Sequence, residues 1–112
     1  TETLIQELYN QALTHKAVIP VVPVIDSLRI VDGNSSKAVA RDNYRAVQTP
    51  QVFHASILKE AFTQEGYENF TDEASLVEAN GQAIHLVPGE DSNIKITVPA
   101  DLVFAEAMLL KP

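Results

Sequence analysis

A continuous apolar run at residues 17–25 constrains the fold of this chain more than any other segment. Its letters, AVIPVVPVI, are mostly β-branched residues. Such a run predicts a strand covered on both faces, as in the sheet of an α/β protein. Pro20 and Pro23 each lack a ladder donor, so we expect the strand to bend, or to be free on one side, at those positions.

Helical and strand patterns alternate on either side of this run. Residues 1–15 carry an apolar stripe at helical spacing, and helices are predicted again at residues 50–62, 71–79 and 99–110. Strands are predicted at residues 44–48, 82–87 and 93–97, and the last helix, apolar nearly all round, is expected to be well buried. This alternation predicts an α/β fold with a mainly parallel sheet.

The corner at residues 44–53 is predicted to join a strand ending at Gln48 directly to a helix. Thr49 is a suitable N-cap, and Pro50 suits the first helical position, where its missing N–H is not needed. The amides of such a corner favour an anion. An ordinary helix start explains the same residues. Thr71 is expected to cap the helix at residues 71–79, and Asn80-Gly81 to end it.

Residues 26–41 read as a two-stranded excursion with a turn at residues 32–36. An isolated ribbon of this size is only marginally stable in water, so it needs a surface to lie on. That surface is either a partner subunit or the ribbon's own domain, and the sequence favours neither.

Composition narrows the class of protein. A chain of 112 residues forms at most one domain. Its net charge of −7 argues against nucleic-acid or anionic-membrane binding, which needs a basic face. It has no cysteine, which excludes disulfides and thiol catalysis and fits a cytoplasmic location. No apolar run approaches membrane-spanning length. The first residues resemble neither a signal peptide nor an initiator methionine, so we expect the chain to begin inside something longer, or to have been processed.

Few residues are candidates for chemistry. Lys95 lies on the polar side of a predicted strand just before a helix start, where it could hold a phosphate or simply face solvent. Arg41 and Arg45 flank the return of the ribbon and would ordinarily pair with surface acids such as Asp42. The three histidines have no metal-ligand spacing and are interpreted as non-catalytic, and no common catalytic or nucleotide-binding motif is present.

Four stretches, in a fixed order, resemble one enzyme family. They are residues 23–29 (PVIDSLR), residues 39–53 with the corner QTPQVF, residues 71–81 beginning TDEAS, and residues 93–102 beginning NIKIT. Together they resemble 2-C-methyl-D-erythritol 4-phosphate cytidylyltransferase of the non-mevalonate isoprenoid pathway, over essentially the whole chain.

The resemblance implies transfer of a cytidylyl group from CTP to the 4-phosphate of methylerythritol, with release of pyrophosphate and with magnesium as cofactor. It also implies a Rossmann-like nucleotidyltransferase sheet. Residues 1–112 would form a single partial domain, in which residues 26–43 are a protruding β-arm that clasps a second subunit in a homodimer.

Five residues match the family's substrate site by position. Arg41 corresponds to the arm arginine that positions the acceptor phosphate in the partner subunit, and Lys95 to the lysine that holds this phosphate within its own subunit. Ser27 matches a substrate-contacting position at the base of the arm. Thr49 and Thr71 match positions that line the same pocket.

Two departures from the family pattern stand out. Ala40 occupies a position where many members carry an acid, which would loosen the orientation of Arg41. The family's Gly-rich CTP-binding loop and its metal-binding Asp have no counterpart, so the chain resembles only the C-terminal half and is expected to be inactive alone. A ribitol-phosphate cytidylyltransferase and a non-catalytic dimerisation or binding module are the alternatives.

Overall fold

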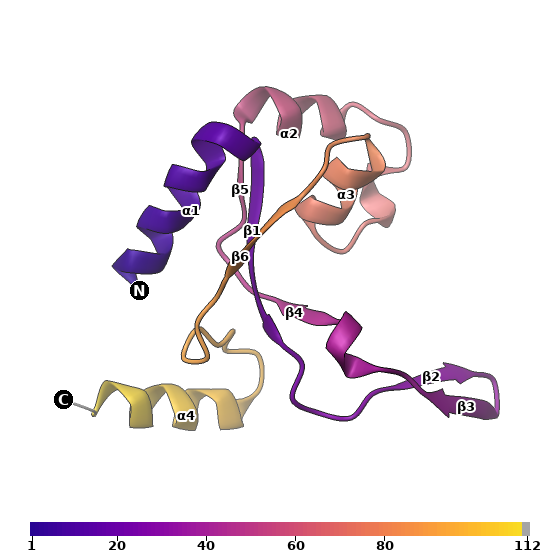
Figure 1. Ribbon diagram of the computed structural model, residues 1–112, viewed down its shortest axis with the longest axis vertical. Coiled ribbons are helices and arrows are strands. Elements are labelled where there is room, and N and C mark those ends of the chain that lie inside the picture. Colours follow the sequence, from indigo (N-terminus) through magenta and orange to yellow (C-terminus); the bar gives the residue numbers. More distant parts are fainter. Residues whose placement is uncertain (111–112) are drawn as a thin grey trace.

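The computed structural model describes residues 1–110, which contain one four-stranded sheet and a separate two-stranded sheet (Figure 1). In chain order the elements are α1 (Glu2–His15), β1 (Ala17–Pro23), β2 (Arg29–Asp32), β3 (Ser35–Ala38), the 3-10 turn η1 (Arg41–Asn43), β4 (Arg45–Val47), β5 (Val52–Phe53), α2 (Ala55–Phe62), η2 (Tyr67–Asn69), α3 (Glu73–Ala79), β6 (His85–Pro88) and α4 (Pro99–Leu109). The α/β class predicted from the sequence is confirmed.

The apolar run forms β1, the central strand of the sheet. Along one edge β1 pairs antiparallel with β4 and β5, and along the other it pairs parallel with β6. Val18, for example, lies opposite Val52 on one side and His85 on the other. The sheet is therefore mixed, not mainly parallel as the alternating pattern predicts.

Both faces of β1 are covered where it begins. Val18 packs with Val87 and the apolar side of α1, whose buried residues are Leu4, Leu8 and Ala12. Ala17 belongs to a second cluster with residues of α2 and α3, namely Ala61, Leu76 and Val77. Neighbouring strand residues point to opposite faces, so adjacent positions of one strand contribute to two different cores. The prediction of a doubly covered strand is confirmed.

The predicted helix at residues 50–62 begins later than expected. Thr49 and Pro50, which are joined by a cis peptide bond, lie outside any helix, so Thr49 is not a helix cap and Pro50 is not a first helical residue. Residues 52 and 53 instead form β5, opposite residues 18 and 17 of β1. Helix α2 starts only at Ala55, after His54. Pairing with β1 satisfies backbone groups and half-buries Phe53, which outweighs the local Thr-Pro helix signal.

Two further local predictions need correction. Asp72, not Thr71, is the N-cap of α3: its carboxylate accepts from the amide of Ser75 at 2.9 Å. Residues 93–97 form no strand and run as an irregular segment towards α4. The predicted helix stop is confirmed, because Asn80 is the C-cap of α3 and Gly81 follows with φ of +94°, a value that favours glycine.

The predicted two-stranded excursion is confirmed as the hairpin β2–β3. Its register places Arg29 opposite Ala38 and Asp32 opposite Ser35. Every residue of both strands is exposed, and Figure 1 shows the hairpin projecting away from the sheet and the helices. We call residues 26–43 the arm.

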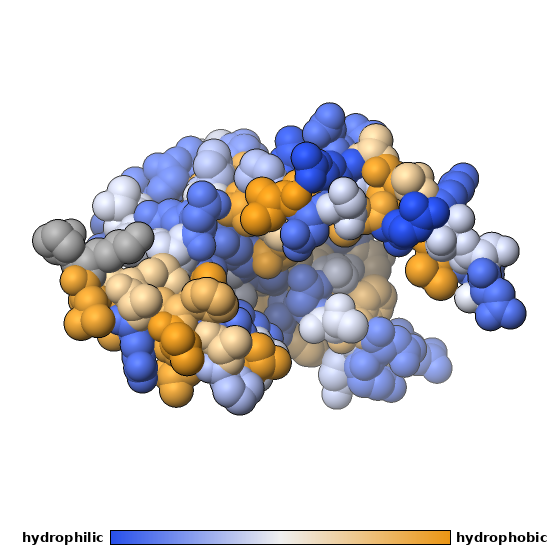
Figure 2. All heavy atoms as spheres, turned by 90° about the horizontal axis from the view of Figure 1, so that it is seen from below, coloured by the Kyte–Doolittle hydropathy of each residue, from blue (hydrophilic) through white to orange (hydrophobic). Residues whose placement is uncertain are grey.

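Helix α4 was expected to be well buried, and this is wrong. None of its residues is buried, and Figure 2 shows apolar residues gathered on its surface. Its exposed large apolar residues within the bounds of the helix are Leu102, Val103, Phe104 and Leu109. The apolar composition of this helix therefore indicates a surface that residues 1–110 do not cover.

Candidate functional site

A pocket of about 230 Å³ lies where the corner after β4 meets the segment after β6. Two of the predicted site residues, Thr49 and Lys95, line it together although they are far apart in the sequence. The other lining residues are Val47, Gln48, Gln51, Asp72 and Asn93. We call this space the Lys95 pocket. An ammonium group among amide side chains suits an anion such as a phosphate.

The two glutamines that flank Thr49-Pro50 each hold a neighbouring segment. Gln51 donates to the Asp72 carboxylate at 3.3 Å and accepts from the amide of Ala74 at 3.2 Å, which ties the residue before β5 to the start of α3. Gln48 bonds to the segment after β6 in the same manner. Sequence reasoning missed both glutamines, although a polar amide on each side of a Thr-Pro pair was a visible signal.

Asp72 lines the Lys95 pocket but is engaged in the structure of α3. Its hydrogen bond from Ser75 lowers the pKa of the Asp72 carboxyl, an effect opposed by partial burial and reinforced by Gln51. The group is therefore a stable carboxylate at neutral pH. The negative charge of Asp72 would repel a bound phosphate. Among the residues that line the pocket, Lys95 carries the positive charge, so Lys95 supplies the attraction.

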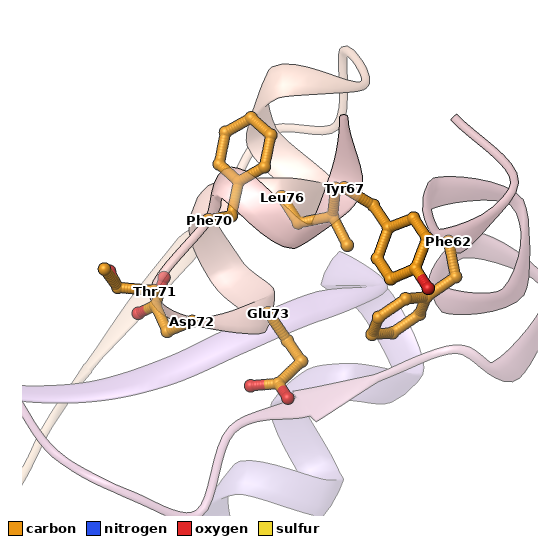
Figure 3. Close-up of a pocket in the computed structure, with 7 residues that line it drawn as sticks. All are labelled: Phe62, Tyr67, Phe70, Thr71, Asp72, Glu73 and Leu76. Carbon is orange, nitrogen blue, oxygen red and sulfur yellow. The ribbon is translucent and has the colours of Figure 1, made fainter. Parts of the chain in front are cut away.

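Thr71 lies in an adjacent, smaller pocket of about 80 Å³. Figure 3 shows it beside Asp72, on the opposite side of that pocket from Phe62 and Tyr67. The rings of Phe62 and Tyr67 meet edge to face, with centroids 5.5 Å apart. The structure thus places Thr71 one residue away from the lining of the Lys95 pocket rather than in it.

Ser27 and Arg41 lie at the base of the arm, outside the residues that line the Lys95 pocket. The guanidinium of Arg41 donates to the backbone carbonyl of Ile25. Arg45 donates to the carbonyls of Asp42 and Tyr44 at 2.9 and 2.8 Å. Both arginines therefore bind backbone carbonyls near the arm, where the sequence suggested pairing with surface acids.

The described residues form no cluster of metal-ligating side chains. Within residues 1–110 there is no group of three or more His, Cys, Asp or Glu side chains placed to hold a metal ion. His15 stacks on His85 with ring centroids 3.6 Å apart, and His54 Nε2 lies 2.8 Å from the carbonyl oxygen of Ala12. No helix in this part of the chain is long and apolar enough to cross a bilayer.

Comparison with known proteins supplies the family. The family model for 2-C-methyl-D-erythritol 4-phosphate cytidylyltransferase (IspD) matches residues 1–111. The chain belongs to this family. The resemblance read from the four sequence stretches is thereby confirmed.

Relatives and solved structures agree with this assignment. The cytidylyltransferase of Bacteroides thetaiotaomicron is 49% identical over 109 residues, which are 97% of this chain and 50% of the relative. The crystal structure of the Thermus thermophilus enzyme is 38% identical with a TM-score of 0.85, covering 96% of this chain and 55% of that one. The crystal structure of the Francisella tularensis enzyme is 32% identical with a TM-score of 0.83, and the match covers 96% of this chain and 52% of that one. The chain spans about half the length of the curated IspD relatives it matches.

Proposed function

We propose that this chain forms the acceptor-phosphate part of an enzyme that transfers a cytidylyl group from CTP to 2-C-methyl-D-erythritol 4-phosphate. An oxygen of the acceptor phosphate attacks the α-phosphorus of CTP. A P–O–P linkage forms, the bond to the β-phosphate oxygen breaks, and pyrophosphate leaves. The observation that carries this proposal is the joint lining of one pocket by Lys95 and Thr49 in a member of the IspD family.

Electrostatics explains why such a reaction needs a lysine at this place. The acceptor phosphate and the triphosphate are both anions and repel each other as they approach. A cation beside the acceptor offsets this repulsion and fixes the direction of attack. Lys95 would hold the phosphate, and Thr49 and Thr71 would contact the same substrate from the corner and the α3 start.

Arg41 and Ser27 take their proposed roles in a homodimer. They lie at the base of the arm and not in the Lys95 pocket, which supports a role for Arg41 at the site of a partner subunit that the arm clasps. The exposed hairpin β2–β3 supports the same arrangement, because an isolated two-stranded ribbon gains stability by lying on another surface.

We further propose that residues 1–112 alone do not catalyse the transfer. The four glycines, at positions 33, 66, 81 and 89, are isolated from one another, so they form no Gly-rich loop for a triphosphate. The magnesium that accompanies CTP would find its ligands mainly in the half of the family's fold that this chain does not match. A cytoplasmic location stays a prediction based on the absence of cysteine.

The test is to measure binding of the acceptor to this polypeptide by ³¹P NMR titration. We expect 2-C-methyl-D-erythritol 4-phosphate to bind, and Lys95→Ala to weaken binding about tenfold, as loss of a hydrogen bond to a charged group implies. Lys59→Ala, an exposed lysine on α2, is the matched control and should bind like the parent chain.

Three results would count against parts of this proposal. Equal binding by Lys95→Ala and the parent chain would remove Lys95 from the site. Stronger binding of ribitol phosphate than of methylerythritol phosphate would change the acceptor. Release of pyrophosphate by the parent chain above the Lys95→Ala level, with CTP and magnesium present, would show that it is active alone.

A further inference from the structure

The side chain of Gln48 makes the two backbone hydrogen bonds to the segment after β6 that a paired strand residue would make. Its side-chain Nε2 donates to the carbonyl of Glu90 at 2.8 Å, and its Oε1 accepts from the amide of Glu90 at 3.1 Å. Donating to and accepting from the same residue is how hydrogen-bonded residues pair across antiparallel strands. One half-buried side chain thus satisfies both backbone groups of a residue that belongs to no strand.

Asn93 adds a second link between the same two segments. Its Nδ2 donates to the carbonyl of Thr49 at 2.6 Å and lies 3.4 Å from Gln48 Oε1. The irregular segment from residue 89 to residue 93 is therefore held at Glu90 and at Asn93. Gln48 and Asn93, whose side-chain amides make these bonds, both line the Lys95 pocket. Lys95 follows Asn93 by two residues.

Gly89 makes this close approach possible. A Cβ atom at position 89 would lie 2.3 Å from Gln48 Oε1 and 3.3 Å from the carbonyl oxygen of Val21. The first contact is far below any real Cβ distance, so a side chain at position 89 would push the Gln48 amide away. The amide of Gly89 also donates to the carbonyl of Val21 at 2.7 Å, continuing the approach of this segment to β1.

We propose that Gln48 and Asn93 are positioning residues that hold Lys95 ready for the acceptor phosphate. This inference rests on the proposed function. Ordering a flexible backbone costs free energy, and if Lys95 lay on a loose segment, each binding event would include that cost. Hydrogen bonds that order the segment beforehand leave more of the lysine–phosphate attraction available for binding.

Two substitutions disturb this arrangement in different ways. Gln48→Met keeps the length of the side chain and removes both bonds to Glu90. Gly89→Ala keeps the glutamine and displaces its amide. We expect each to speed amide hydrogen exchange at residues 90–95 and to weaken acceptor binding about fivefold. Gln64→Met, in the loop after α2, is the matched control and should change neither quantity.

A double-mutant cycle separates positioning from a general structural role. If Gln48 acts through Lys95, Gln48→Met should weaken acceptor binding in the parent chain and have no further effect in the Lys95→Ala background. Equal weakening in both backgrounds, or no weakening in the parent chain, would overturn the proposal. Absence of acceptor binding by the parent chain would instead overturn the proposed function on which it rests.

Discussion

At the scale of single residues, side-chain hydrogen bonds decide how the site is held together. Asp72 caps α3 through the amide of Ser75 and also accepts from Gln51. Threonine and aspartate are both good N-cap residues, and Thr71 and Asp72 are neighbours, so the sequence does not distinguish between them. From the sequence alone we predict Thr71. The glutamine that reaches Asp72 is Gln51, the residue before β5, so the choice depends on a contact between distant segments.

Replacing Asp72 should destabilise the protein at neutral pH. Asp72→Ala removes the cap and should lower the free energy of unfolding by about 1 kcal/mol, measured by urea denaturation. The pKa of Asp72 is lower in the folded chain than its ordinary value. Its contribution is therefore present above that ordinary value and lost as pH falls through the lowered pKa.

The difference between the parent chain and Asp72→Ala should accordingly shrink below about pH 4. Asp91→Ala, an exposed acid outside any helix, serves as the control and should leave stability nearly unchanged. An equally large difference in strong acid would show that the carboxylate charge is not what stabilises the start of α3.

At the scale of whole elements, pairing and packing decide between competing local signals. Residues 50–53 carry a helix-start pattern, yet residues 52 and 53 form β5 because β1 offers them a ladder. Helix α1, by contrast, agrees with its sequence at both ends, Glu2–His15. Its apolar stripe has a ready partner in Val18 and Val87, so local pattern and tertiary contact favour the same structure.

The α1 stripe offers a direct test of this packing. Leu8 is fully buried, with 0% of its surface exposed, whereas Leu13 on the same helix is 82% exposed. Leu8→Ala should lower the free energy of unfolding by about 2–5 kcal/mol, because it removes buried apolar surface and leaves a cavity. Leu13→Ala should change stability by less than about 0.5 kcal/mol. Similar effects of the two changes in chemical denaturation would contradict this placement of α1.

At the scale of the whole molecule, the chain is open in shape. Its radius of gyration is 16.5 Å, against about 13 Å for a compact domain of this length. The arm and α4 both lie away from the sheet (Figure 1). Each also exposes apolar side chains, such as Ile30 on the arm and Phe104 on α4. Exposed apolar surface of this kind favours association.

If the arm clasps a second subunit, changing the arm should dissociate the assembly. We expect light scattering to give a dimeric mass for the parent chain and a monomeric mass for the double variant Ile30→Asp with Val31→Asp, because buried carboxylates would oppose contact. Phe104→Ser on α4 is the control and should stay dimeric. A monomeric parent chain, or dissociation caused by the α4 change alone, would contradict dimerisation through the arm.

The family and part of the candidate site could be predicted because the residues form recognisable patterns. The order of the four stretches identified the family, and Lys95 and Thr49 do line one pocket. The roles of all five residues in a working site, Ser27, Arg41, Thr49, Thr71 and Lys95, stay predictions. The hydrogen-bond partners of Gln48 and Asn93 could not be predicted, because these bonds join residues 42 to 44 positions apart in sequence, and such contacts leave no periodic signal.

The sequence by itself determined the α/β class, α1, the doubly covered β1, the hairpin and the stop after α3. These follow from hydrophobic periodicity and turn chemistry, which act over a few neighbouring residues. Only the tertiary structure decided the mixed sheet, the strand at residues 52 and 53, the cap at Asp72, the irregular path of residues 93–97 and the exposure of α4. Each of these features depends on whether a segment distant in the chain offers a contact. Local propensity contributes too little free energy to outweigh the presence or absence of such a contact.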